Sequence, residues 1–208
     1  TSAGPSTKLS KVAPAEKYAL IWGDEKIGNA RYIPGMPGLI TQSPGDTAGI
    51  TQYDYQTNGS TGNRVVVDAA SGVHVDWMKG MPYPATRAVY FNYADALGNI
   101  SFPGGVRASE TYRNGDGYPQ IGITTDDRAV VAFHNGGTRE SLYVATDAFP
   151  GGGTFTTYRT QMMFAGDPEP CFWPYISVDR NNRVHMVASE FLSSAGSEQS
   201  FGYKRSTN

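Results

Sequence analysis

The chain has 208 residues, of which 39% are hydrophobic and 17% charged, and its formal net charge is −2. This balance excludes a sequence-wide attraction for nucleic acid or an anionic membrane surface, and no apolar run approaches the ~20 residues of a membrane-inserted helix. The single cysteine, Cys171, excludes a disulfide framework and a multi-cysteine metal site. The 25 glycines and 13 prolines favour short strands joined by turns over long helices.

Residues 1–60 form the first predicted region, made of N-terminal strands and a Pro/Gly-rich loop. The opening residues, TSAGPST, have neither an initiator Met nor an apolar targeting segment, which is typical of a mature end after removal of a secretion signal and equally of a trimmed one. Strands are predicted at 18–22 and 49–55, with the loop over 28–48 between them. We therefore expect a secreted or cell-surface protein.

An internal repeat organises the rest of the chain. Segments 63–77, 119–133 and 174–188 align without gaps, about 55 residues apart. In each segment a short alternating strand (65–67, 121–123, 176–178) leads through a turn rich in Asp, Asn, Gly or Ser into a second strand (73–77, 129–133, 184–188). Third strands are predicted at 88–93, 141–145 and 201–204, and fourth strands at 100–102 and 154–158.

Four antiparallel strands per repeat are typical of β-propeller blades. The sequence therefore predicts an all-β β-propeller, with blade repeat 1 at 61–115, blade repeat 2 at 116–170 and an incomplete blade repeat 3 at 171–208. Closed propellers have four to eight blades, whereas this chain provides three to four. Because an open strand edge promotes aggregation, we expect a propeller that is incomplete or completed by assembly; a two-sheet sandwich is the alternative.

Two stretches carry a family resemblance. Tyr118-Pro119, with the hydrophobic and acidic residues that follow, and its equivalent Trp173-Pro174 resemble the blades of sialidase-like (BNR-type) β-propellers, and more closely the repeat propellers of uncharacterised secreted bacterial proteins, over about residues 60–208. The resemblance implies a fold and little about activity. The family's Asp-box, Ser-x-Asp-x-Gly-x-Thr-Trp, is absent. The sialidase arginine cluster does not carry over either, because Gln120 and Tyr175 stand at the positions equivalent to Arg64.

Aromatic residues give the most suggestive candidate site. Gly62, Tyr118 and Trp173 share one repeat position, just before the first strand, which in a propeller lies at one mouth near the axis. Aromatic rings there would stack on sugar rings or anchor a partner chain. The opposing interpretation is that the rings plug the channel or pack between blades. The predicted ligand-binding residues are Arg64, Tyr83, Tyr118, Phe172, Trp173 and Tyr175.

The remaining candidates favour structural roles. His74 and His185 share a repeat position, which indicates packing, whereas His134 ends its strand with no obvious partner. A glycoside hydrolase needs two carboxyl groups, but no spacing selects a pair among Asp76, Asp116, Asp167, Glu169 and Glu190. Trp77 is predicted in the core and Cys171 as a buried thiol. Turn roles are predicted for Asp68, Asp126, Asp127 and Asp179. We predict no catalytic residue, metal site or cofactor.

The sequence thus predicts a non-catalytic extracellular module that binds a glycan or protein partner at the propeller face, within a cell-surface or extracellular assembly. Self-assembly through open strand edges is a further expectation, and neither nucleic acid nor membrane insertion is expected. Two alternatives stay open. One is a sialidase-like glycoside hydrolase that uses a carboxylate pair, and the other is a structural subunit of a surface filament.

Overall fold

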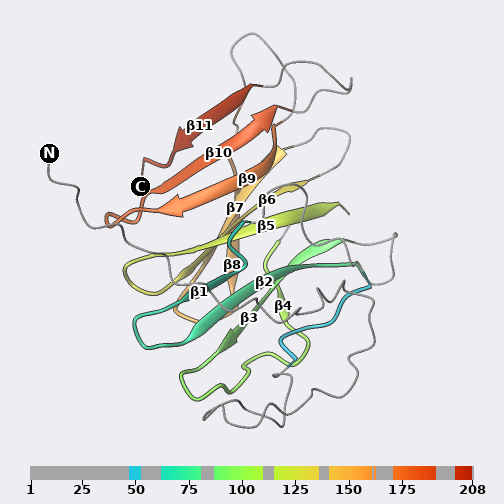
Figure 1. The fold of residues 1–208 in the computed structure, drawn as a ribbon, viewed down its shortest axis with the longest axis vertical. Coiled ribbons are helices and arrows are strands. Elements are labelled where there is room, and N and C mark those ends of the chain that lie inside the picture. Colours follow the sequence, from blue (N-terminus) through green and yellow to red (C-terminus); the bar gives the residue numbers. More distant parts are fainter. Residues whose placement is uncertain are drawn as a thin grey trace, which may run out of the picture. The chain divides into compact units, whose positions relative to one another are not determined.

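The computed structural model in Figure 1 describes residues 47–52, 62–80, 87–109, 115–135, 141–160, 162, 171–190 and 200–207. The chain divides into two compact units, Thr1–Ser43 and Pro44–Asn208, and every described residue belongs to the second. The strand predicted at 18–22 lies outside the described residues, and residues 49–52 carry no strand. The described part is all-β, and no helix in it is long and apolar enough to cross a membrane.

Within the described residues, eleven strands form three antiparallel sheets, each following the order of the chain (Figure 1). The first sheet contains β1 (Val65–Val67), β2 (Val73–Lys79), β3 (Ala88–Ala94) and β4 (Val106–Arg107). The second contains β5 (Asp116–Ile123), β6 (Ala129–Asn135), β7 (Ser141–Asp147) and β8 (Phe155–Arg159). The third contains β9 (Cys171–Val178), β10 (Val184–Glu190) and β11 (Phe201–Arg205). They lie within 61–115, 116–170 and 171–208, respectively.

The turn between the first two strands is the same in all three sheets. Its first residue donates its N–H to the carbonyl of its fifth, as from Asp68 to Gly72 (2.9 Å) and from Asp179 to Arg183 (2.9 Å). Its fourth residue has a positive φ, 67° at Ser71, 60° at Asp127 and 61° at Asn182. Asp and Asn tolerate this left-handed conformation better than most residues. The predicted hairpin turns are therefore confirmed.

The fourth strand predicted at 100–102 is wrong. Ile100 forms only an isolated bridge with Ala94, and the fourth strand is β4, further along the chain. The cause is the Asn92 side chain, which donates to the Phe102 carbonyl (2.7 Å) and accepts the Phe102 N–H (3.1 Å). The Phe102 backbone therefore bonds to the Asn92 side chain instead of to the backbone of a neighbouring strand. Gly104 and Gly105, with φ of +79° and +78°, then turn the chain into β4.

The core lies on both faces of the second sheet. Every residue of β6 is buried, and because successive strand residues point to opposite faces, β6 contacts both neighbouring sheets. Phe133 packs in one cluster with Phe91 of the first sheet, whereas Ala132 packs in the other with Met186 of the third. The structure thus shows a stack of three antiparallel sheets, while the closed ring of a propeller stays a prediction.

Trp77 does not lie in this core, contrary to the prediction. His74, Asp76 and Met78 are the buried residues of β2, so Trp77 points to the opposite face of the first sheet. Its indole is half-buried, 6.0 Å from the Tyr90 ring, and a Cβ at Gly49 would overlap it. The repeat alignment pairs Trp77 with Phe133. Phe133 is buried because it faces the preceding sheet, whereas no described strand lies on the side of the first sheet that Trp77 faces.

Candidate functional site

Two aromatic residues at equivalent repeat positions share an unusual backbone conformation. Tyr118 in β5 has a φ of 49° and Trp173 in β9 a φ of 50°. Both residues lie at an irregularity in the strand pairing. In the β5–β6 pair the register shifts between Gly117 and Gln120. In the β9–β10 pair it shifts between Val187 and Ser189 of β10, opposite the part of β9 that contains Trp173. Bulges redirect side chains, and a positive φ in a bulky residue costs on the order of 1–3 kcal/mol. The repeat therefore imposes this conformation twice, on two half-buried rings.

Gly62, the third residue at this repeat position, has a different role. A Cβ at Gly62 would overlap the amide end of the Gln120 side chain. Gln120 is itself buried in β5. The first sheet therefore contributes no ring at this position because the second sheet's glutamine occupies the space.

His134 holds the aromatic residues together. Its ring lies 5.2 Å from that of Tyr118, 4.5 Å from Phe172 and 6.4 Å from Trp173. Its Nδ1 accepts the backbone N–H of Trp173 (3.3 Å), so the neutral ring carries its proton on Nε2. Burial, reinforced by the positive charge of Arg87, lowers the pKa of His134 to about 3. We call Tyr118, His134, Phe172 and Trp173 the aromatic cluster.

Arg87 fixes the start of β5 beside this cluster. Its guanidinium donates to the carbonyls of Gly115 (2.6 Å) and Asp116 (3.1 Å) and lies 5.7 Å from the Tyr118 ring centre. This distance suits a cation–π contact. The buried Asp116 carboxylate accepts a hydrogen bond from Asn135 (2.6 Å) and lies 3.7 Å from Arg107. These contacts hold the strand end that carries Tyr118.

Arg64 adds a cationic group from the first sheet. Its Nη1 lies 3.6 Å from Oδ1 of Asp76, whose side chain has no exposed surface. Burial lowers the pKa of Arg64, which also lies within electrostatic range of Tyr118 and Tyr175. Burial raises the pKa of Asp76 to about 8, against the attraction of Arg64.

Arg64 of the first sheet lies within electrostatic range of Tyr118 from the second sheet and Tyr175 from the third, and Trp173 comes two residues before Tyr175 on β9. Phe172 is only 6% exposed and lies beneath the surface, against His134. Tyr83 lies outside the described residues. The sequence missed the roles of His134 and Arg87 because their partners come from other strands. The ring position shared by Tyr118 and Trp173 was the only signal that pointed to them.

The other candidate groups are structural or undescribed. His74 bonds Asp68 (3.2 Å) and His185 bonds Asp179 (3.2 Å), in support of packing roles. The Asp116 and Asp76 side chains are fully buried. Asp167 and Glu169 lie outside the described residues, as does the side chain of Glu190. No group of His, Cys, Asp and Glu residues within the described ranges could hold a metal ion.

A separate groove of about 620 Å³ opens between the second and third sheets. It lies among the turn residues Thr124 and Asn182 and the strand residues Tyr158, Met186 and Lys204. None of the predicted ligand-binding residues lines it. The Lys204 ammonium donates to the Thr160 carbonyl at its edge.

Comparisons with known proteins give a distant likeness in fold. The sequence matches no protein-family model and no curated protein. Among solved structures, the fold is similar to that of a thermostable family-43 glycoside hydrolase, with a TM-score of 0.47 and 10% sequence identity. The similarity covers 68% of this chain and 52% of that one, so it spans about half of the enzyme. It assigns no activity to this chain, and it does not single out the sialidase-like propellers that the repeat resembles.

Proposed function

We propose that this protein is a non-catalytic extracellular binding module that binds a glycan at Arg64, Tyr118, Trp173 and Tyr175. The observation that carries the proposal is the paired conformation of Tyr118 and Trp173, with φ of 49° and 50° at equivalent positions of two sheets. Strained backbone persists where the surroundings impose it, and such residues cluster at ligand sites. Both rings keep exposed surface rather than disappearing into the core.

The chemistry of the site suits a sugar that carries a carboxylate. Tyrosine and tryptophan offer large apolar faces with a polar edge, which fit a pyranose ring. The planar guanidinium of Arg64 pairs well with a carboxylate. Burial raises the pKa of Asp76 to about 8, which favours the protonated carboxyl beside Arg64 at neutral pH. His134, held neutral under the rings, keeps them in place.

A sialidase-like glycoside hydrolase is the second candidate, and the raised pKa of Asp76 favours it, because a general acid must hold its proton at neutral pH. Contact with a glycosidic oxygen requires an accessible side chain, however, and the Asp76 and Asp116 side chains have no exposed surface. We therefore place binding ahead of hydrolysis. A module inside a cell-surface assembly needs only the binding surface.

A glycan array with the purified protein tests the proposal. We expect retention of glycans with a carboxylated sugar and about tenfold weaker binding by Trp173→Ala and Tyr118→Ala, which each remove one stacking surface. Tyr158→Ala is the matched control, since this tyrosine is 60% exposed but lies on β8 in the separate groove.

Three results would overturn this assignment. One is a glycan array on which the protein binds no glycan with a carboxylated sugar. Another is a loss of binding in Tyr158→Ala alone, which would move the site to the groove. The third is turnover of fluorogenic glycosides that Asp76→Asn abolishes, which would make the protein an enzyme.

A further inference from the structure

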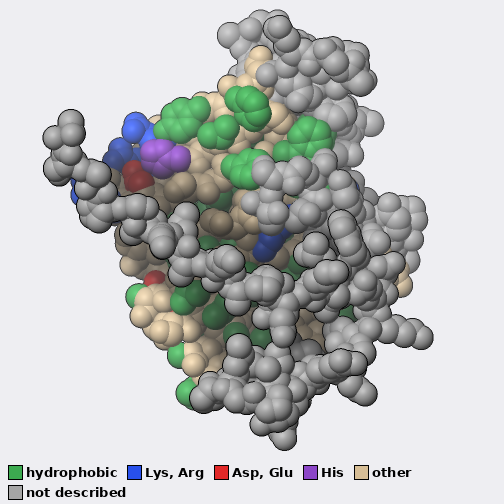
Figure 2. All heavy atoms as spheres, in the orientation of Figure 1, with side chains coloured by type: hydrophobic (Ala, Val, Ile, Leu, Met, Phe, Trp, Pro, Cys, Tyr) green, Lys and Arg blue, Asp and Glu red, His purple; other side chains and the backbone are tan. Residues whose placement is uncertain are grey.

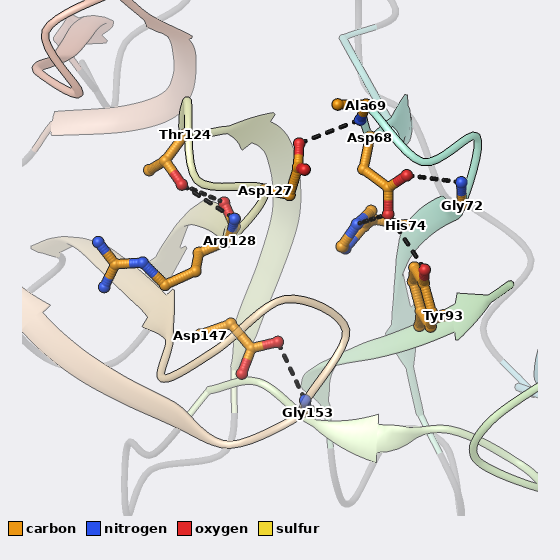
Figure 3. A network of polar contacts seen from close by, with 10 residues as sticks. All are labelled: Asp68, Ala69, Gly72, His74, Tyr93, Thr124, Asp127, Arg128, Asp147 and Gly153. Carbon is orange, nitrogen blue, oxygen red and sulfur yellow. Dashed lines mark hydrogen bonds and ion pairs between the residues drawn. The ribbon is translucent and has the colours of Figure 1, made fainter.

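The same hydrogen bond joins consecutive sheets twice. The N–H of Ala69, in the turn of the first sheet, donates to Oδ1 of Asp127 in the second (3.1 Å), as Figure 3 shows. The N–H of Thr125, in the second sheet, donates to Oδ1 of Asn182 in the third (2.7 Å). Ala69 and Thr125 are equivalent in the repeat, and so are the positive-φ residues Asp127 and Asn182. We call this contact the turn-to-turn bond.

The third sheet has the donor of a further bond of this kind, and the first sheet has the acceptor. In the third sheet the equivalent donor is the N–H of Arg180, for which no acceptor is found among the described residues. In the first sheet the equivalent acceptor is the hydroxyl of Ser71, which has the same positive φ of 67°. Both residues are exposed.

Apolar side chains near these turns are likewise exposed at the two ends of the stack and buried between the sheets. Val65 of the first sheet is 52% exposed, whereas its equivalent Ile121 is fully buried against the preceding sheet. Val187 of the third sheet is 39% exposed, whereas its equivalent Ala132 is fully buried against the following sheet. Each end of the stack therefore exposes positions that the repeat buries elsewhere.

The two exposed faces extend beyond these single residues. Tyr203 pairs with Val187 in the ladder and is 62% exposed, and Phe201 is 76% exposed. Figure 2 shows hydrophobic side chains gathered over β9, β10 and β11, beside a histidine with basic and acidic neighbours. On the first sheet, Val67 is 59% exposed next to Val65.

We propose that a second copy of this chain occupies these faces. The first sheet of one copy packs on the third sheet of the other, and the Arg180 N–H donates to the Ser71 hydroxyl of that second copy. This contact continues the interface that already joins the three sheets. Two copies joined in both directions supply twice the three sheets seen here, a number within the four to eight blades of closed propellers. The expected species is therefore a closed dimer.

Light scattering on the full chain tests this assembly with one variant for each face. We expect the native protein to have twice the mass of a 22.4 kDa chain. Val67→Asp on the first sheet and Val187→Asp on the third place a charge in the proposed contact, so each should weaken dimerisation about a hundredfold. Leu97→Asp is the matched control, because Leu97 is 88% exposed and belongs to neither face.

Mixing the two variants gives the decisive result. Each variant keeps one intact face, so an equimolar mixture should form a one-to-one pair, which also shows that both variants are folded. A monomeric native protein, or a dimer that both variants retain, would overturn the proposal. Long polymers that both variants abolish would support the sheet-to-sheet contact and overturn its closure at two copies.

Discussion

At Trp173 the usual preference for alanine over glycine in a strand should be reversed. Glycine in a strand is normally about 0.5–1 kcal/mol less stable than alanine. At Trp173, where φ is 50°, glycine adopts the backbone without strain and alanine does not. We therefore expect Trp173→Gly to be more stable than Trp173→Ala by about 1 kcal/mol in urea unfolding.

The same pair of substitutions at Tyr175 serves as the control. Tyr175 lies on the same strand and is not among the residues with a positive φ. Alanine should therefore be the more stable replacement at this position. An alanine advantage at both positions would contradict the strained conformation of Trp173.

Asp76 gives the stability a distinctive dependence on pH. Burial raises its pKa from 3.8 to about 8, so the folded protein holds a proton that the unfolded chain has lost. Stability from this group is complete below pH 4 and falls as the pH rises towards 8. We expect a loss of about 1 kcal/mol between pH 6.5 and 8 in urea unfolding.

Asp76→Asn imitates the protonated side chain and should remove most of this slope. Comparison of the variant with the native protein separates Asp76 from two buried histidines, because both proteins contain them. Burial lowers the pKa values of His74 and His134 below 6.5, so their effects on stability appear at lower pH and have the opposite sign. An unchanged slope in the variant would show that Asp76 is ionised in the folded protein.

Single residues also mark what the sequence could predict. Tyr118 and Trp173 were identified because they recur at one repeat position. Their positive φ and their shared contact with His134 were not, because both depend on bulges and on packing between β5, β6 and β9. A periodic pattern reports which residues are equivalent, whereas the environment of a buried polar group depends on distant segments.

At the scale of the elements, the turn between the first two strands does more than reverse the chain. Asp127 supports its own turn through a positive φ and accepts the Ala69 N–H from the neighbouring sheet. We expect Asp127→Asn to preserve both roles, while Asp127→Gly preserves only the backbone conformation. Amide exchange of the Ala69 N–H should therefore be faster in the glycine variant and near native in the asparagine variant. Equal exchange in both would contradict the turn-to-turn bond.

Strand positions were predicted well where buried and more exposed residues alternate, as in β2 and in residues 186–188 of β10. They were predicted badly at 100–102, where the chain is apolar enough for a strand but Asn92 binds its backbone. Whether a side-chain amide or a neighbouring strand binds this backbone depends on where the amide lies in space. That position cannot be obtained from local pattern alone.

At the scale of the whole molecule, Cys171 reports whether the stack unfolds as one unit. Its thiol is 2% exposed and lies in the cluster between the second and third sheets, where it donates to the Met162 carbonyl (3.4 Å). We expect a thiol reagent to label it only after these sheets separate. Labelling and loss of the β-sheet circular dichroism should share one urea midpoint. Labelling at a clearly lower midpoint would mean that the third sheet detaches before the rest unfolds.

The repeat also set the limit of prediction at this scale. It predicted the three sheets that the described residues form, because every one of these sheets repeats one pattern of strands and turns. The number of sheets in a closed ring depends on the angle between neighbours, which is determined by side-chain volumes at each interface. No residue pattern within one repeat encodes that angle.

The turn-to-turn bond has a consequence for how such chains evolve. Its donor is a backbone N–H, which every residue except proline provides, and its acceptor is a short polar side chain that the turn itself favours. One sheet therefore recognises the next without a matched pair of side chains. Duplicating or deleting one repeat leaves a compatible junction behind, so recombination within the gene can change the number of sheets without new interface mutations.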